Sequence, residues 1–476
     1  MNRTETFFRI AFLQPVYMEP MSSSQDLLTG PIAPTLTKMT KQVMYGMIML
    51  MSFNLVDTFF IGLLGTEPLA AISFTFPVTF TIISLAIGLG IGTSAIVAKA
   101  NGSGNKEESK EDGQGALILS FLLVILLAIV MYNLTDIIFS ALGASQELMP
   151  LIHSYMDVWY IGSVFLMLPM IGNAILRANG DTKTPSILMG GTGLINAILD
   201  PILIFGLGPV PAFGIMGAAI ASVVSWGVGL LIIIYILTVR KRLISTQLIN
   251  FKELIVIAKK ILKIGLPAAG ANMLTPIAMA VLTAIIASYG TAAVAGFGVG
   301  SRIESIASLV VLALSMTLPP FISQNFGANQ WQRVFDAYKQ TTKFVMIWQL
   351  IVYLVLCLAA GLIAFAFGKD DPEVMYVIKL FIWTMPIGYG LQGIIILTNS
   401  SFNALHKPMY ALVLSVVRLF VFFVPFAYLG SYFYGLPGLF VGGVIGNIFT
   451  ALIAYRWFVR TVESSIENGK INLEQI

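Results

Sequence analysis

The chain contains little charge and almost no cysteine. Only 11% of its 476 residues are Asp, Glu, Lys or Arg, whereas soluble domains contain about 25%. The single cysteine, Cys357, excludes an internal disulfide and a cysteine-based metal site. His153 and His406 are too far apart in sequence to suggest a site by their spacing. No phosphate-binding glycine loop and no spaced set of catalytic or metal-binding residues is recognisable. We therefore expect no ATP-driven step, no cofactor, no metal and no enzymatic activity.

Apolar residues are abundant instead. They make up 57% of the sequence, and the mean hydropathy is +0.88. Runs of about 20 apolar residues, enough to cross a bilayer as a helix, recur along the whole chain. These runs lack the alternation of membrane β-strands, and helices satisfy their backbone hydrogen bonds internally. The composition therefore predicts an all-α membrane protein embedded in a lipid bilayer.

Polar breaks divide the sequence into twelve expected transmembrane segments. These are residues 36–63, 69–98, 115–142, 149–177, 183–206, 213–239, 262–288, 293–322, 337–367, 374–401, 407–430 and 436–459. Basic residues gather at every second break, and 23 of the 27 lie on that side. Because loops rich in Lys and Arg stay in the cytoplasm, both termini are expected to be cytoplasmic. The net charge of +4 thus reflects membrane orientation, and we expect no nucleic-acid partner.

The two halves of the chain share three short signatures in the same order, at offsets of 221 to 225 positions. They are GTEPLAA (65–71) with GTAAVAG (290–296), NGDTKTP (179–185) with FNALHKP (402–408), and GIMG (214–217) with GLPG (435–438). An internal repeat of one apolar unit is typical of membrane transporters. Six segments per half make the two lobes parallel, with a pseudo-symmetry axis along the membrane normal.

These features predict five regions along the chain. They are an N-terminal cytoplasmic segment (1–33), an N-lobe (34–239), a cytoplasmic linker (240–261), a C-lobe (262–460) and a cytoplasmic tail (461–476). Apolar and basic residues of the linker fall on separate helical faces, which favours an amphipathic helix on the inner membrane surface. A solvated linker is the alternative.

Two acidic residues stand out inside spans of the first half. Asp57 follows Asn54 in span 1 and Asp200 follows Asn196 in span 5, both in the outer half of the membrane. A charge inside a span costs at least about 2.5 kcal/mol, so each needs a reason. A carboxyl group away from water disfavours its charged form, so it can bind a proton from one side and release it on the other. Carboxylate and amide oxygens also suit Na⁺. The third interpretation is structural, with the aspartates bonded to asparagines and holding helices together.

Pro201 directly follows Asp200. Proline removes a backbone donor and disfavours helix at the preceding residue. This predicts a bend in span 5 beside Asp200, which would serve as a hinge.

The second half carries different charges. At the repeat offset, Asp57 corresponds to about Leu282 and Asp200 to about Phe423, so we expect the coupling chemistry in the first half only. Three charged residues of the second half stand out within its spans instead, namely Arg302, Glu304 and Arg418. These residues either line a central cavity or form an ion pair inside the lobe, because unpaired charge there is costly.

The sequence resembles the multidrug and toxic compound extrusion (MATE) family from about Pro31 to Arg460. The matching pieces are Asn54-Leu-Val-Asp57, Asn196-Ala-Ile-Leu-Asp200-Pro201, Gly-Ala-Ala-Ile-Ala-Ser222 and Ser323-Gln-Asn-Phe-Gly-Ala328. The resemblance implies two six-helix lobes with a cleft that opens alternately to the two sides of the membrane. It also implies export of cationic, hydrophobic compounds in exchange for H⁺ or Na⁺.

Within this family the chain looks closest to the DinF-type branch. That resemblance assigns ion coupling to Asp57, Asn196 and Asp200, with Asn54 beside them, and adds Ser222 in span 6 and Tyr155 in span 4. The branch's tyrosine one turn before the span 1 aspartate is Phe53 here. The NorM-type branch has acidic residues in spans 7 and 10, and this chain has none in either.

We therefore expect a monomeric secondary antiporter in the bacterial cytoplasmic membrane. Its partners are small cationic or hydrophobic substrates, and H⁺ or Na⁺ is the coupling ion. One alternative is a lipid-linked oligosaccharide flippase of the same wider superfamily, which favours a cavity rich in basic residues. The other is an uncoupled channel or scaffold, which has no need of buried aspartates.

Overall fold

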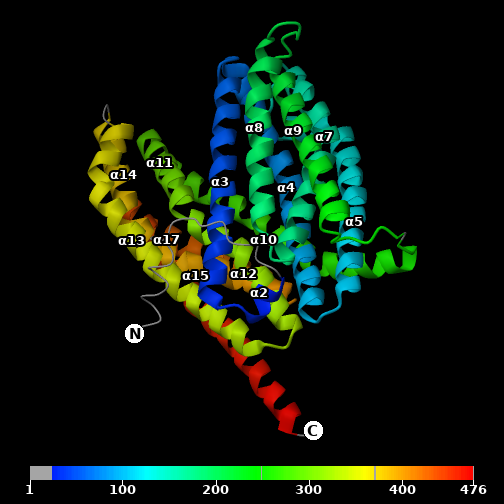
Figure 1. Ribbon diagram of the computed structural model, residues 1–476. Coiled ribbons are helices and arrows are strands. Elements are labelled where there is room, and N and C mark those ends of the chain that lie inside the picture. The colour runs from blue at the N-terminus through cyan, green and yellow to red at the C-terminus, as the bar shows by residue number, and fades with distance from the viewer. Residues whose placement is uncertain (1–23, 248, 369–370, 475–476) are drawn as a thin grey trace. The chain divides into compact units, whose positions relative to one another are not determined.

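The computed structural model describes residues 24–247, 249–368 and 371–474, and no strand occurs among them (Figure 1). The helices of the first half are α2 (Ser24–Thr29), α3 (Ile32–Gly62), α4 (Thr66–Gly102), α5 (Lys106–Asn133), α6 (Thr135–Ala141), α7 (Met149–Ala178), α8 (Lys183–Phe205), α9 (Ile215–Tyr235) and η1 (Ile236–Arg240). Those of the second half are α10 (Phe251–Ala287), α11 (Thr291–Ala307), α12 (Leu309–Gly327), α13 (Trp331–Gly368), α14 (Pro372–Thr384), η2 (Met385–Gly388), α15 (Tyr389–Ala404), α16 (Pro408–Val416), η3 (Val417–Phe423) and α17 (Val424–Glu474). The expected all-α fold is confirmed.

Within the described residues, eleven helical stretches are long and apolar enough to cross a membrane. The longest, Pro408–Glu467, has 60 residues, about three times the roughly 20 residues that one crossing needs. It is interrupted at Gly435, whose φ of 64° and ψ of −150° are not helical. A Cβ on Gly442 would lie 2.1 Å from the carbonyl oxygen of Phe426, so the chain doubles back on itself. The stretch therefore supplies spans 11 and 12.

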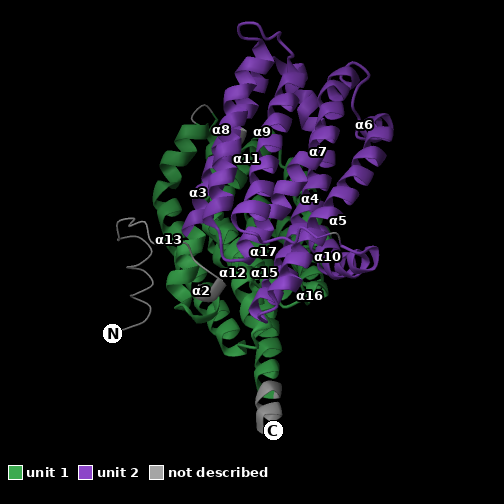
Figure 2. Ribbon diagram, turned by 45° about the vertical axis from the view of Figure 1, so that its right-hand side comes forward, with its two compact units in different colours: residues 1–17, 27–40, 270–476 green, residues 18–26, 41–269 purple. Residues whose placement is uncertain are grey.

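The chain forms two compact units, which Figure 2 shows in different colours. The unit that comes first in the sequence, here called the first unit, is built mainly from residues 41–269 and is purple in Figure 2 (unit 2 in its key). The second unit is built from residues 27–40 and 270–476 and is green (unit 1 in the key). The three division points within the described residues fall inside helices, in α2, α3 and α10, so each of these helices contributes residues to both units. The linker residues of α10, from Phe251 to Ile261, belong to the first unit, and so do the residues that follow them as far as Ala269.

The first unit has an apolar core formed by α4, α5, α7 and α9. The rings of Trp159 on α7 and Trp226 on α9 meet edge to face, with 6.2 Å between their centroids. The linker part of α10 joins this core through Ile257 and Ile261. On its polar side, Lys260 Nζ donates to Glu108 Oε1 at 2.8 Å, so part of the linker's basic face is paired with acidic residues of α5.

The internal repeat is visible in the backbone. Gly65 and Gly290, which begin the first signature in each half, have φ values of 118° and 102°. Gly214 and Gly435, which begin the last signature, have φ values of 58° and 64°. Residues other than glycine rarely adopt these conformations, so the same turn requires glycine in both halves.

The middle signature repeats in a different register from the one that the sequence suggests. The amide of Asp181 bonds to the carbonyl of Leu176, and that of Lys407 bonds to the carbonyl of Phe402. The two bonds have the same geometry at the ends of α7 and α15. They show that His406, with φ of 59°, occupies in the second half the position that Gly180, with φ of 83°, occupies in the first half. The sequence alignment is three residues off here because a histidine occupies the left-handed position that glycine holds in the first half.

Candidate functional site

Small residues on α8 allow α3 to pack closely against it. A Cβ on Gly190 would lie 2.7 Å from the Met49 sulfur, and one on Gly193 would lie 2.2 Å from the ring of Phe53. The side chains of α3 thus fill the space left by the glycines of α8. Contacts advance in the same direction along both helices, so the helices run parallel, as spans 1 and 5 require. Asp57 lies one turn beyond Phe53, at the level where α8 reaches Asp200.

Asp57 and Asp200 come together at this level. Their carboxyl groups are within hydrogen-bonding range of each other. An ionised carboxylate has no hydrogen to donate, so this bond forms only when one of the two carries a proton. Asp200 is fully buried, and Asp57 is half-buried. Asp57 Oδ1 and Asp200 Oδ2 are buried oxygens that have no hydrogen-bond partner among the described residues.

Asn196 connects Asp200 to the next helix. Its Nδ2 donates to Asp200 Oδ1 at 3.2 Å and to Ser222 Oγ at 3.3 Å. Asn196 and Asp200 are four residues apart on α8 and therefore share a helix face. Tyr155 on α7 lies within electrostatic range of both aspartates and packs against an apolar cluster that contains Ile61. The structure thus brings five of the sequence-predicted residues into one region of the first unit.

Two further predicted residues complete this description. Asn54 lies on α3, and its side chain is outside the described residues. Pro201 lies inside α8, which continues through it to Phe205. Because proline has no N–H, the carbonyl of Ala197 lacks its helical partner one turn before Pro201.

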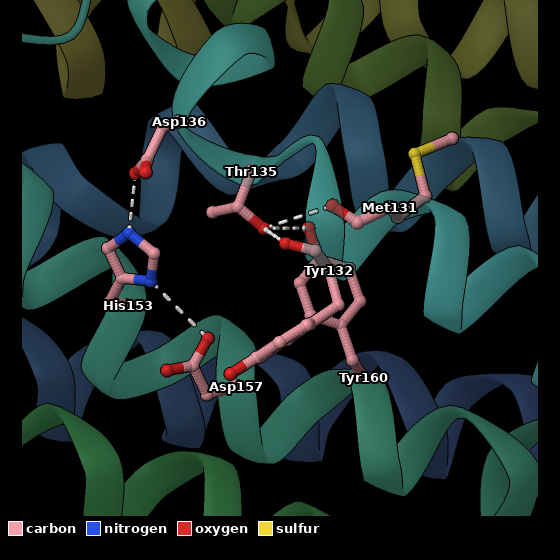
Figure 3. Close-up of polar contacts among 7 residues, drawn as sticks. All are labelled: Met131, Tyr132, Thr135, Asp136, His153, Asp157 and Tyr160. Carbon is pink, nitrogen blue, oxygen red and sulfur yellow. Dashed lines mark hydrogen bonds and ion pairs between the residues drawn. The ribbon is translucent and has the colours of Figure 1, made fainter.

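His153 lies near the start of α7 and links two acidic residues (Figure 3). Its Nε2 is 2.7 Å from Asp136 Oδ1, and its Nδ1 is 3.4 Å from Asp157 Oδ1. A pocket of about 440 Å³ beside it is lined by Asp136, Gln146 and Met149, among others. The Asp136 side chain is 78% exposed, so we assign these contacts to holding α6 against α7. Among the described residues no cluster of His, Cys, Asp and Glu could hold a metal ion.

The counterparts of the aspartates in the second unit are apolar and buried. Leu282 is 1% exposed and Phe423 is 7% exposed, and both belong to one hydrophobic core. Of the charged residues expected in this lobe, Arg302 is exposed on α11. Glu304 Oε1 accepts a hydrogen bond from Gln392 Nε2 at 3.1 Å. Arg418 and Glu304 affect each other electrostatically.

Sequence reasoning missed the partners of these charges. Gln392 and Tyr389, both on α15, lie close to Glu304. A glutamine and a tyrosine inside an apolar span are weaker signals than a charged residue. The two residues are three positions apart on α15, which begins at Tyr389 directly after the short 3₁₀ segment η2.

Comparisons with known proteins agree with this architecture. The model of the MatE family matches residues 43–202 and 267–429, more than half of the chain. The chain belongs to the MATE family. A Shewanella oneidensis protein named FAD transporter is 41% identical over 435 residues, which cover 91% of this chain and 96% of that protein. A Staphylococcus haemolyticus protein named multidrug export protein MepA is 24% identical over 439 residues, 91% of this chain and 94% of that one.

Solved MATE structures have the same fold. The Vibrio cholerae MATE transporter VcmN in its bent form has a TM-score of 0.86 and 35% identity, covering 93% of this chain and 98% of that one. An outward-facing multidrug resistance MATE transporter has a TM-score of 0.87 and 29% identity, covering 94% and 100% of the two chains. This MATE protein is therefore a multi-pass membrane transporter, and the expected twelve-helix, two-lobe fold is confirmed.

Proposed function

We propose that this transporter is a secondary exporter in the bacterial cytoplasmic membrane, with cytoplasmic termini, and that proton binding at Asp57 and Asp200 drives export. The observation that carries the proposal is the pair of adjacent carboxyl groups, each with a buried oxygen that lacks a partner. One proton placed between them supplies the missing hydrogen bond and removes the repulsion between two nearby negative charges. Loss of that proton to the opposite side of the membrane resets the pair.

A proton explains this geometry better than Na⁺. Hard metal cations in proteins take about six oxygen ligands. Among the described residues of this region, only two buried carboxylate oxygens lack partners, and the Asn196 amide nitrogen points to both Asp200 and Ser222. Pro201 lies next to Asp200, so a change in the carboxyl pair acts on a helix turn that already lacks one backbone hydrogen bond.

We propose a flavin dinucleotide as the cargo. Support comes from the relative named FAD transporter, whose 41% identity over 91% of this chain exceeds the 24% to 26% of the relatives named for multidrug resistance or export. The second candidate is the cationic, hydrophobic drug that the sequence led us to expect. It is favoured by the number of relatives and solved structures named for multidrug transport.

The test uses inverted membrane vesicles, with a pH gradient and a Na⁺ gradient imposed separately. We expect the pH gradient alone to drive FAD accumulation, which is followed by flavin fluorescence after the vesicles are lysed. Asp57→Asn and Asp200→Asn should each abolish this accumulation. Glu67→Gln, which changes an exposed acidic residue at the start of α4, serves as the control and should transport normally.

Three outcomes would contradict the proposal. Near-normal accumulation in both aspartate variants would exclude the carboxyl pair as the coupling site. Transport driven only by the Na⁺ gradient would exclude the proton as the coupling ion. Accumulation of ethidium but not FAD by the wild-type protein would favour the drug as cargo.

A further inference from the structure

A second polar group lies inside the second unit, apart from the aspartate pair. It consists of Glu304 on α11, Tyr389 and Gln392 on α15, and Arg418 on η3. Gln392 holds the Glu304 carboxylate through the 3.1 Å hydrogen bond, and both Arg418 and Tyr389 lie within electrostatic range of that carboxylate. We call these four residues the C-lobe polar group.

The helices that carry the group all depart from regular α-helix beside it. Glu304 lies one turn before Ser308, where α11 ends and α12 begins. Tyr389 is the first residue of α15, directly after the 3₁₀ segment η2. Arg418 is the second residue of the π-helical segment η3. Mid-helix 3₁₀ and π segments often mark functional sites, and interrupted helices in transporters often form the binding site.

Two hydrogen-bond donors in the group have no acceptor. The Tyr389 side chain is 2% exposed, and its hydroxyl is buried without a partner among the described residues. Arg418 Nε is likewise buried without a partner, although the side chain as a whole is half-buried. Buried donors are rarely left unsatisfied, since each costs about 1–3 kcal/mol. A guanidinium within an apolar span adds the cost of an unpaired charge.

A fixed ion pair does not account for Arg418. Such a pair brings a carboxylate oxygen within 4.0 Å of the guanidinium, and no described acidic residue forms one with Arg418. Glu304, the nearest candidate by charge, is oriented by Gln392 instead. Glu304 therefore balances the charge of Arg418 from a distance and leaves the guanidinium free to bind a second anion.

We propose that Arg418 and Tyr389 bind a phosphate group of the transported molecule. This inference rests on the proposed export function and specifies the chemical class of the cargo as phosphate-bearing and anionic. A guanidinium presents a planar set of N–H donors that matches two phosphate oxygens. The Tyr389 hydroxyl adds one further donor.

The experiment compares the transport of three flavins that differ in phosphate content, namely FAD, FMN and riboflavin. In Arg418→Gln we expect KM for FAD and FMN to rise about tenfold or more, as for the loss of a charged hydrogen bond, with riboflavin transport unchanged. Arg418→Lys keeps the positive charge but lacks the planar set of N–H donors, so it should have an intermediate KM. Tyr389→Phe removes one donor in the same shape and should raise KM a few-fold. Arg456→Gln removes an exposed arginine of the same lobe and is the control.

The failures of the site and of the proposed cargo are distinguishable. Unchanged KM for FAD and FMN in Arg418→Gln and Tyr389→Phe overturns the inference, as does an equal loss of riboflavin transport. If Arg418→Gln does not fold, KM for FAD and FMN in the nearly isosteric Tyr389→Phe variant tests the site instead. If the wild-type protein transports no flavin, thermal stabilisation by inorganic pyrophosphate still tests the site. Stabilisation of the wild type but not Arg418→Gln supports the site and rejects the cargo, and no stabilisation of the wild type rejects both.

A lipid headgroup carries the same phosphate chemistry as the cargo. The thermal measurement is therefore repeated in detergent with added phosphatidylglycerol. Stabilisation by this lipid in an Arg418-dependent way, with none by pyrophosphate or FAD, would assign the site to a headgroup and overturn the inference. Stabilisation by pyrophosphate or FAD that added lipid does not replace supports the cargo.

Discussion

Asn196 Nδ2 lies 3.2 Å from Asp200 Oδ1, one helical turn before it on α8, and the same nitrogen reaches Ser222 Oγ on α9. One amide group thus holds one oxygen of Asp200 and connects it to the neighbouring helix. The other oxygen of Asp200 is buried without a described partner. This arrangement leaves one Asp200 oxygen available to share a proton with Asp57.

Replacing Asn196 should therefore disturb coupling without removing an acid. In Asn196→Leu, Asp200 Oδ1 loses its donor, which costs about 1–3 kcal/mol for a buried group. We expect proton-driven transport to fall about tenfold to a hundredfold, measured as the initial rate in vesicles with an imposed pH gradient. Ser222→Ala removes only one acceptor of the same amide and should lower the rate a few-fold. A larger loss in Ser222→Ala than in Asn196→Leu would contradict this order.

The C-lobe core should not tolerate the acid that the N-lobe holds. Leu282, the counterpart of Asp57, is 1% exposed in an apolar cluster that also contains Phe423. Leu282→Asp places a carboxyl group there without a polar partner, at a cost of several kcal/mol. We expect a clear drop in melting temperature and yield in detergent, whereas Leu282→Met, which keeps the volume, should stay close to the wild type. A stable, well-expressed Leu282→Asp protein would show that this region has a polar environment.

The contact between α4 and the first half of α10 should depend on a glycine. A Cβ on Gly88 would lie 2.4 Å from the carbonyl oxygen of Gly265, and backbone cannot move aside as a flexible side chain does. Gly88→Ala should lower the free energy of unfolding by about 1–3 kcal/mol through overpacking, measured by thermal unfolding in detergent. On α8, a Cβ on Gly191 meets nothing within 4 Å, so Gly191→Ala should be neutral or slightly stabilising. Equal effects of the two substitutions would argue against this contact.

Much of the fold is predictable from local sequence. Apolar runs of sufficient length must become helices in a bilayer, because no other structure satisfies the backbone there. The turn glycines of the repeat are equally local requirements, and Gly65, Gly290, Gly214 and Gly435 all have positive φ as the repeat implies. The register at His406 was not predictable, because the left-handed conformation belongs to the turn and the residue type that occupies it differs between halves.

Sequence alone determined that the chain crosses a membrane as a repeated helical unit and that Asp57 and Asp200 lie at similar depth in one half of it. Only the tertiary structure decided that these two carboxyl groups meet, because their approach depends on the glycines of α8 receiving Met49 and Phe53. It also decided that Gln392, Tyr389 and Arg418, from two further helical segments, lie near Glu304. Periodicity specifies which residues a helix must bury, but the fit between side chains of different helices specifies their neighbours.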